Sequence, residues 1–194
     1  MGRPREFDEM QALEQAMGVF WARGYDATSL CDLLSAMDLS KSSFYDTYGS
    51  KHELFLSTLD HYNRTVASKH AAAAIDAAPS AKAGIAAVFQ GAVDCAAGGG
   101  ARRGCYLNNC AVEIAPHDPG VAKRVCNGLG HIEATFHCAL RRAQEEGDLP
   151  ADRDTRALAR YLTSSLNGLM VMAKANPERA ALEDVVRIVL QTLD

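Results

Sequence analysis

Residues 28–55 read TSLCDLLSAMDLSKSSFYDTYGSKHELF and contain three consecutive candidate helix starts. Thr28, Ser40 and Ser50 each precede an apolar run, and a hydroxyl at that place accepts from the free N–H groups of a helix's first turn. Asp38-Leu39 separates the first two runs. Aspartate tolerates the left-handed conformation that a tight turn needs. The stretch therefore predicts two short helices joined by a turn, followed by the start of a third.

Two short helices joined in this way fit a helix-turn-helix, whose second helix enters the DNA major groove with its N-terminus first. Ser42 and Ser43 lie in the first turn of that helix, where small hydroxyls reach phosphates or base edges. Lys41 suits a phosphate, and Tyr45 can present its hydroxyl to the DNA backbone. Lys51 starts the next helix, where free N–H groups already favour an anion.

Further residues extend this hypothesis. Thr28 and Ser40 offer capped helix N-termini to phosphates, and Arg3 and Arg5 form a short basic arm of the kind that contacts DNA. Asp46 would repel a phosphate, so it either points away or accepts from a cytosine amino group. A plainer alternative is a serine-capped helix with its aromatic residues in the core and its lysines in solvent.

The same stretch resembles the DNA-binding domain of the TetR family of transcriptional regulators. The family pattern of a threonine cap, Ser-Lys, a hydrophobe-Tyr pair, an aromatic residue and small-x-Lys-x-x-Leu is matched by Thr28, Ser40, Lys41, Phe44, Tyr45, Tyr48, Ser50, Lys51 and Leu54. The preceding FWARGYDATS (20–29) is also similar. Two departures occur, because the family's turn glycine is Asp38 here and a common alanine is Leu34. The resemblance covers about residues 5–60.

This resemblance implies a homodimeric regulator, repressor by default, that binds a pseudo-palindromic double-stranded DNA operator and is released by a small-molecule inducer. It also implies that the last two helices pair with those of the partner and that the middle helices enclose a ligand pocket. The helix that starts near residue 51 would then link the pocket to the DNA-reading unit of each chain, here called the reading head, which comprises the helices of residues 1–50.

Composition limits how such a protein can bind DNA. The 194 residues are 48% hydrophobic and 23% charged, with a net charge of −4. The first 62 residues carry a net charge of −5, so any DNA contact depends on where a few cations sit. No apolar run approaches the ~20 residues of a membrane span and no signal peptide is apparent, which predicts a cytoplasmic protein without a membrane partner and with reduced cysteines.

The whole chain is predicted to be all-α, with an N-terminal three-helix helix-turn-helix domain (1–50) and a C-terminal ligand-binding and dimerisation bundle (51–194). Asp8 and Gly24 bound the first helix, and Pro119 and Gly147 bound a long one. The helices expected after residue 50 span about 51–77, 80–97, 106–115, 119–146, 153–175 and 178–193.

The last two of these helices carry apolar faces, among them Leu158, Leu162, Leu166, Leu169 and Met172 on one and Leu182, Val186, Val189 and Leu193 on the other. Ser165 and Gly168 are small enough for another helix to approach closely. These faces predict the homodimer interface, and the alternative is that they only cover the core of one chain.

A pocket is predicted around residues 102–118. Asn109 and Glu113 supply polar groups, and the apolar walls would come from Phe89, Phe136, Leu166 and Met170, with ordinary core as the alternative for each. Cys105 follows two arginines at a helix start, and both features should lower its pKa. Some TetR-like regulators sense electrophiles or oxidants through a cysteine at this place, so the resemblance implies the same role here.

Enzyme chemistry is not expected. The chain lacks Gly-x-Gly-x-x-Gly after a strand, a P-loop, Gly-x-Ser-x-Gly and His-Glu-x-x-His. The histidine and cysteine spacings match no strong zinc pattern, so no metal and no cofactor are predicted. The alternative function is a helical ligand- or thiol-sensing protein without specific DNA binding, which the acidic N-terminal segment keeps open.

Overall fold

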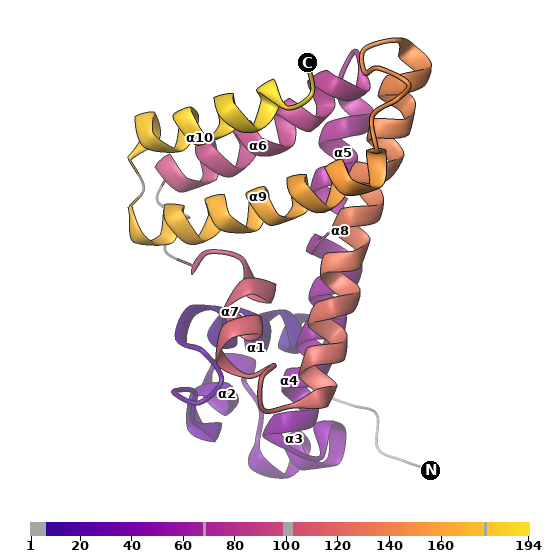
Figure 1. Cartoon of the computed structure of the whole chain (residues 1–194). Helices are drawn as coiled ribbons and strands as arrows, with labels where there is room; N and C mark the ends of the chain where they lie inside the picture. The colour runs from indigo at the N-terminus through magenta and orange to yellow at the C-terminus, as the bar shows by residue number, and fades with distance from the viewer. Residues whose placement is uncertain (1–6, 68, 99–102, 177) are drawn as a thin grey trace.

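The computed structural model describes residues 7–67, 69–98, 103–176 and 178–194, and every regular element within them is helical (Figure 1). The all-α prediction is confirmed. The elements are α1 (Glu9–Arg23), α2 (Leu30–Met37), α3 (Lys41–Tyr48), α4 (Lys51–Tyr62), the π-helical turn η1 (Asn63–Ala67), α5 (Lys69–Ala77), α6 (Ala81–Ala97), α7 (Tyr106–Glu113), α8 (Pro119–Glu146), α9 (Thr155–Ala175) and α10 (Arg179–Gln191).

The first four helices pack around a small apolar core. Phe20 of α1 lies edge-on to Phe55 of α4 with ring centroids 5.0 Å apart, and Phe44 of α3 is fully buried. Burying one such ring stabilises the fold by about 1.5–3 kcal/mol. Between α2 and α3, Asp38 adopts φ 51° and ψ 46°, the left-handed turn predicted for it.

Most predicted helix starts are confirmed, with one correction. The hydroxyls of Ser40 and Ser50 accept from the N–H groups of Ser43 and Glu53 at 3.1 and 3.0 Å. The start of α2 was placed one residue too early, because Ser29 and not Thr28 is its cap. Ser29 accepts from Asp32 N, and the Asp32 carboxylate accepts from Ser29 N, which completes a capping box.

The helix predicted from 51 to about 77 is interrupted. After Tyr62 the chain makes the π-helical turn η1 before α5 continues, and residue 68 lies outside the described residues. A π-helical turn inserts extra backbone into an α-helix and is frequently found at functional sites. Its presence means that α4 and α5 need not behave as one rigid rod.

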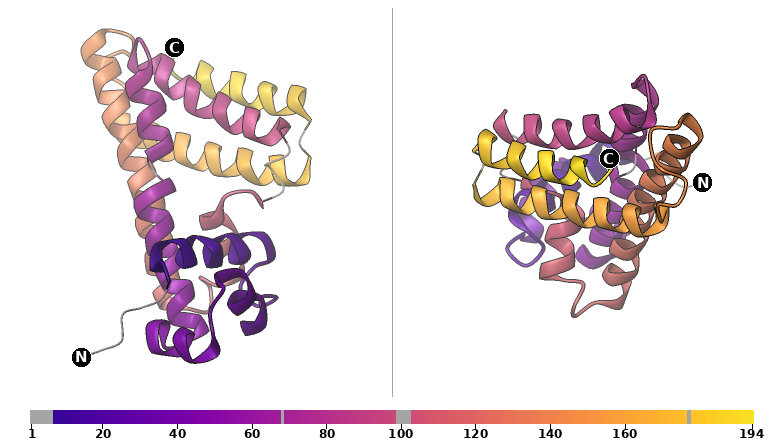
Figure 2. Two further views of the ribbon diagram at one scale, coloured as in Figure 1. Left: turned by 180° about the vertical axis from the view of Figure 1, so that it is seen from behind. Right: turned by 45° about the horizontal axis from the view of Figure 1, so that its top comes forward.

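Helix α8 has 28 residues, a length of about 42 Å, and runs along the whole molecule (Figures 1 and 2). The α4–η1–α5 segment lies beside it. Helices α6, α9 and α10 form a layer across one end of α8, and α1–α3 lie at the other end, with α7 between the two groups. One apolar core runs through both groups.

The predicted division at residue 50 falls between α3 and α4. Helix α4 packs against α1 on one side and against α8 on the other, so the two units share it, and the division stays a prediction. Within the described ranges, no helix is long and apolar enough to cross a membrane.

Candidate DNA-binding surface and ligand cavity

Helix α3 displays its hydroxyl-rich first turn to solvent. The Ser40 hydroxyl lies 3.0 Å from that of Ser42 and 2.9 Å from that of Ser43, so the three form one cluster. Lys41 beside them is exposed. In the next turn Phe44 is buried, and its ring meets Tyr45, which is itself 46% exposed, edge-on at 5.3 Å. The buried face anchors the helix while the hydroxyls remain available to a partner.

Lys51 occupies a defined place at the start of α4. Its Nζ lies 4.3 Å from the centroid of the Tyr25 ring, a cation–π contact. Tyr25 belongs to the turn between α1 and α2, and its ring also packs on Phe55 at 4.7 Å. Tyr25 enters the family resemblance through the FWARGYDATS stretch, but its contact with Lys51 is not predictable from sequence. A ring and a lysine 26 positions apart give no local signal.

Three other predicted DNA-binding residues have different outcomes. Thr28 is 1% exposed and its hydroxyl donates to the Gly24 carbonyl at 2.6 Å, so it neither caps α2 nor faces a phosphate. It was predicted wrongly because its neighbour Ser29 has the same capping chemistry. Arg3 and Arg5 lie outside the described residues, and the role of the arm stays a prediction.

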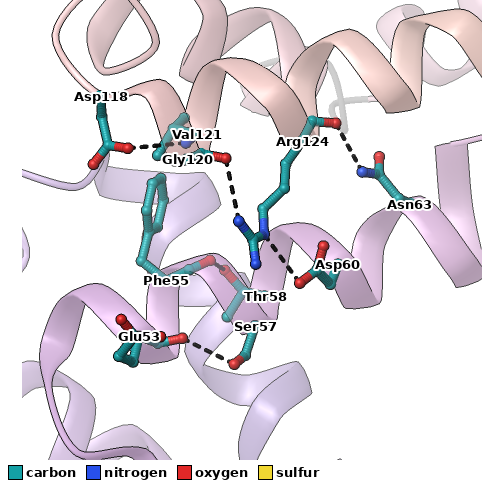
Figure 3. Close-up of polar contacts among 10 residues, drawn as sticks. All are labelled: Glu53, Phe55, Ser57, Thr58, Asp60, Asn63, Asp118, Gly120, Val121 and Arg124. Carbon is teal, nitrogen blue, oxygen red and sulfur yellow. Dashed lines mark hydrogen bonds and ion pairs between the residues drawn. The ribbon is translucent and has the colours of Figure 1, made fainter.

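A polar junction holds the end of α4 to the start of α8 (Figure 3). Arg124 Nε donates to Asp60 Oδ2 at 3.0 Å, and its Nη1 donates to the Gly120 carbonyl at 3.2 Å. Asn63, the first residue of η1, donates from Nδ2 to the Arg124 carbonyl at 2.9 Å. Asp118 caps α8 by accepting from Val121 N at 3.0 Å. The π-helical turn is therefore tied to α8 where it begins.

A cavity of about 410 Å³ lies between the π-helical turn η1 and the helices of the C-terminal layer. Helices α4, α5, α6, α8 and α9 contribute to its walls, together with η1. Among the described residues that line it, none is Asp, Glu, Lys or Arg. The walls are made by Tyr62, Val66, Ala67, His70, Ala71, Ala74, Ala87, Val88, Gly91, Ala92, Cys95, Cys105, Ile132, Leu166, Asn167 and Met170.

Cys105, Leu166 and Met170 line this cavity, as expected for ligand-binding residues. Phe89 and Phe136 do not. Both are fully buried and stack on each other with centroids 6.0 Å apart, so the alternative of ordinary core applies to them. The walls also include η1 and α5, which the pattern around residues 102–118 does not predict.

The two polar residues predicted for the pocket have other partners. Asn109 donates to the Arg103 carbonyl at 2.9 Å and accepts from Lys174 Nζ at 3.1 Å. Glu113 turns toward the N-terminal unit and accepts from Tyr25 N at 2.9 Å. Both predictions were wrong because each side chain satisfies polar groups of a nearby loop or helix, partners that residue type alone does not reveal.

The expected lowering of the Cys105 pKa is also wrong. Cys105 is 8% exposed, and its burial raises the pKa of the thiol. Hydrogen bonds from the N–H groups of Asn108 and Leu107 act in the opposite direction but are outweighed. Burial likewise raises the pKa of Cys110 to about 12. Both thiols are therefore neutral at neutral pH. Arg102, one of the two arginines expected to lower the pKa of Cys105, lies outside the described residues.

Helices α9 and α10 leave an apolar face open to solvent. Met172 is 53% and Ile188 51% exposed, and between the helices lies a shallow groove of about 540 Å³. A Cβ atom placed on Gly168 would meet no atom within 4 Å, so no described side chain covers that glycine. The groove is lined by Tyr161, Ser165, Gly168, Leu169, Met172, Asp184, Val185, Ile188 and Val189.

Two known protein families match this chain, one in its N-terminal part and one in its C-terminal part. Residues 12–58 match the family of bacterial regulatory proteins named after TetR, and residues 81–189 match the tetracyclin repressor-like C-terminal domain. This chain belongs to the TetR family. The first match covers α2 and α3 entirely, which confirms that the hydroxyl-rich helix is part of the family's helix-turn-helix.

Relatives within the TetR family extend over the full chain. An uncharacterized HTH-type transcriptional regulator, YezE of Bacillus subtilis, is 39% identical and aligned over 100% of both chains. The HTH-type transcriptional repressor ComR of Escherichia coli is 31% identical, over 99% of this chain and 90% of that protein. A cysteine mutant of the TetR-family regulator CifR, solved with 26-bp operator DNA, is 35% identical with a TM-score of 0.87 and covers 99% of this chain and 100% of that one. The protein is accordingly a TetR-family transcriptional regulator.

Proposed function

We propose that this TetR-family regulator is a homodimeric repressor that reads a pseudo-palindromic operator with α3 and releases it when a small uncharged molecule fills the cavity. The observation that carries the proposal is the exposed first turn of α3, where Ser40, Lys41, Ser42 and Ser43 gather at the helix N-terminus. That is the part of a recognition helix that meets base edges.

The DNA contacts divide into two kinds. Lys41, Tyr45 and Lys51 contact phosphates, and Arg3 and Arg5 reach the duplex from the N-terminal arm. Ser42 and Ser43 contact base edges, so they supply sequence preference. Ser40 holds the other hydroxyls in place as the cap of α3.

The occupant of the α9–α10 groove is a second copy of this chain. Exposed Met172, Val185 and Ile188 give the groove an apolar surface, and Ser165 and Gly168 allow a helix to come close. A helix-turn-helix protein with one reading helix per chain needs two copies to read a two-fold site. The dimer therefore supplies both burial of the face and the second reading head.

The ligand is small and carries no net charge. An ion buried in a cavity needs an opposite charge beside it. The described lining residues contain no carboxylate, ammonium or guanidinium group, and the one imidazole among them belongs to His70, an exposed residue. Tyr62 and Asn167 provide polar groups for a hydroxyl or carbonyl, while alanine, valine, leucine and methionine side chains surround the rest. The ligand releases DNA only if it binds more tightly to the dimer geometry that does not fit the operator. Operator DNA must then weaken ligand binding by the same factor by which the ligand weakens operator binding.

Operator binding is tested by fluorescence anisotropy with duplexes that tile the DNA flanking the protein's own gene, together with sedimentation of the protein and its complex. We expect one duplex to bind far more tightly than scrambled DNA, with two chains per site. If no duplex binds specifically, the alternative of a helical ligand-sensing protein replaces this proposal. A stable monomer that still binds specifically would contradict the dimer.

Ligand class is tested with two molecules of similar size, benzyl alcohol and benzoate. Thermal unfolding should shift upward with benzyl alcohol in proportion to binding and should not shift with benzoate. Ala92→Phe, which fills part of the cavity, should remove the shift. Equal stabilisation by the two molecules would contradict an uncharged ligand.

A further inference from the structure

We propose that Glu113 is a positioning residue for DNA binding, because it fixes Tyr25 and Tyr25 in turn fixes Lys51. These contacts connect the end of α7 to the turn between α1 and α2, and that turn to the start of α4. The inference rests on the proposed function, since it assumes that Lys51 contacts a phosphate of the operator.

The first step is the contact between α7 and the α1–α2 turn. Glu113, the last residue of α7, accepts with Oε1 from Tyr25 N at 2.9 Å and from Asp26 N at 3.2 Å. Hydrogen bonds to an ionised carboxylate are about twice as strong as neutral ones. They join residues 87 or 88 positions apart, so they serve tertiary placement and not a local turn.

Gly24 makes this contact possible. Its backbone adopts φ 83° and ψ 170°, a conformation that is essentially restricted to glycine. A Cβ atom at Gly24 would also stand 2.8 Å from Glu113 Oε2. The turn thus has both the conformation and the free space that bring the carboxylate onto its N–H groups.

The second step is the Tyr25 side chain. Once its backbone is held, the ring packs on both Phe20 and Phe55, with centroid distances of 5.9 and 4.7 Å, and the three rings form one cluster. The exposed side of this arrangement carries Lys51, whose Nζ lies 4.3 Å from the Tyr25 ring centroid. A long lysine side chain has about 2 kcal/mol of rotamer entropy. Holding it over a ring before DNA arrives reduces what binding must overcome.

The other end of α7 meets the ligand cavity. Cys105, the N-cap of α7, lines that cavity. Trp21 of α1 donates from Nε1 to the carbonyls of Arg103 and Gly104 at 3.2 and 3.1 Å, and its ring meets Tyr62, another cavity residue, edge-on at 5.3 Å. Helix α7 is thus attached to the reading head at both ends, and a shift at the cavity end moves Glu113.

The test is the salt dependence of operator binding, measured by anisotropy for the wild type, Glu113→Ala, Lys51→Ala and the double variant. Each phosphate contact contributes about 0.9 to the slope of log K against log salt. We expect Glu113→Ala to lower the slope by most of the amount lost in Lys51→Ala, and the double variant to lose no more than Lys51→Ala alone. A purely structural cap would lower affinity at every salt concentration and leave the slope unchanged.

Two further variants separate position from charge and from folding. Glu113→Gln keeps an acceptor oxygen and should retain most of the slope, whereas Tyr25→Leu removes the ring and should match Lys51→Ala. Glu145→Ala, an exposed carboxylate on α8, is the matched control and should leave the slope unchanged. Circular dichroism confirms that each variant is folded.

An additive loss of slope in the double variant overturns the inference, and so does a Lys51→Ala protein with the wild-type slope. In both cases specific binding by the wild type still supports operator reading by α3, although the second result also removes the phosphate contact proposed for Lys51. Absence of specific binding by the wild type itself overturns both.

Discussion

Adjacent residues of the same chemical kind have separate roles at the helix-turn-helix. Ser29 completes a capping box with Asp32, whereas the neighbouring Thr28 is buried and bonded to Gly24. On α3, Ser40 holds the first-turn hydroxyls together while Ser42 and Ser43 remain able to reach DNA. Geometry, and not residue type, decides which hydroxyl is structural.

The proposed division between base and phosphate contacts can be measured. Ser43→Ala and Ser42→Ala should change which operator variants bind best, with about 1–3 kcal/mol at the affected base pair. Tyr45→Phe and Lys51→Ala should weaken binding to all variants nearly equally, and Lys51→Ala should also lower the salt slope. Competition anisotropy over a library of single-base operator variants measures both. A Lys51→Ala protein with altered sequence preference and an unchanged salt slope would reverse these roles.

Buried thiols make stability depend on alkaline pH. The pKa of Cys105 is raised and that of Cys110 is raised to about 12, from an ordinary value of 9.0. As pH rises, the two thiols lose their protons in the unfolded chain before they do in the folded protein. The contribution of the two thiols to the free energy of unfolding is therefore fully present below pH 9 and is lost as pH rises toward 12. Denaturant midpoints should fall from pH 8 to pH 10.5, and less steeply in Cys110→Ala.

The same burial predicts the order of thiol reactivity. Cys105 should alkylate more slowly at pH 7.5 than Cys95, which lines the same cavity but is exposed. Mass spectrometry after limited treatment with iodoacetamide gives the order, with exposed Cys31 as the reference. Faster modification of Cys105 would restore the sensor role that its buried, neutral state argues against.

At the scale of elements, the contact between η1 and α8 depends on a residue without a side chain. A Cβ atom on Gly128 would stand 2.2 Å from Asn63 Oδ1 and 2.6 Å from Leu107 Cδ1. Gly128 thus lets the π-helical turn and α7 approach α8 together. The polar junction of Asp60, Asn63 and Arg124 holds the same place (Figure 3).

Gly128→Ala should consequently destabilise the protein. Placing a methyl group in a packed contact costs about 1–3 kcal/mol, and alanine's better helix propensity returns about 1 kcal/mol, so the expected net loss is up to about 2 kcal/mol. Gly130→Ala is the control, because a Cβ there meets nothing within 4 Å and should stabilise α8 slightly. Chemical denaturation of both variants measures the difference. A Gly128→Ala protein as stable as Gly130→Ala would show that the turn yields easily.

At the scale of the whole molecule, α8 connects the N-terminal helices α1–α3 to the C-terminal layer of α6, α9 and α10 (Figure 1). The cavity lies between η1 and that layer. The wall of this cavity includes part of η1, the segment that joins α4 to α5. Under the proposed function, a ligand that fills the cavity would act directly on the connection between α4 and α5. In the proposed dimer, pairing through α9 and α10 would convert that local change into a change in the spacing of the two helix-turn-helix units.

Disrupting the proposed interface should separate the chains and abolish tight operator binding. Ile188→Glu places a charge in the apolar groove between α9 and α10, whereas Gln191→Glu adds the same charge at an exposed position of α10 outside the groove. Analytical ultracentrifugation should show monomers for the first and dimers for the second. Operator affinity should fall at least tenfold only for Ile188→Glu. A dimeric Ile188→Glu protein would place the interface elsewhere.

Local sequence determined the helices and their ends. Asp8, Ser40, Ser80, Asp118 and Gly147 bound their helices as their residue types predict, because a cap depends on groups within a few positions along the chain. The family resemblance rests on the same short-range register. Tertiary structure alone decided the π-helical turn, the partners of Glu113 and Asn109, the burial of Phe89 and Phe136, and the raised pKa of Cys105. Each of these depends on contacts or burial set by segments far apart in the chain, and a residue's own neighbours in sequence carry no information about them.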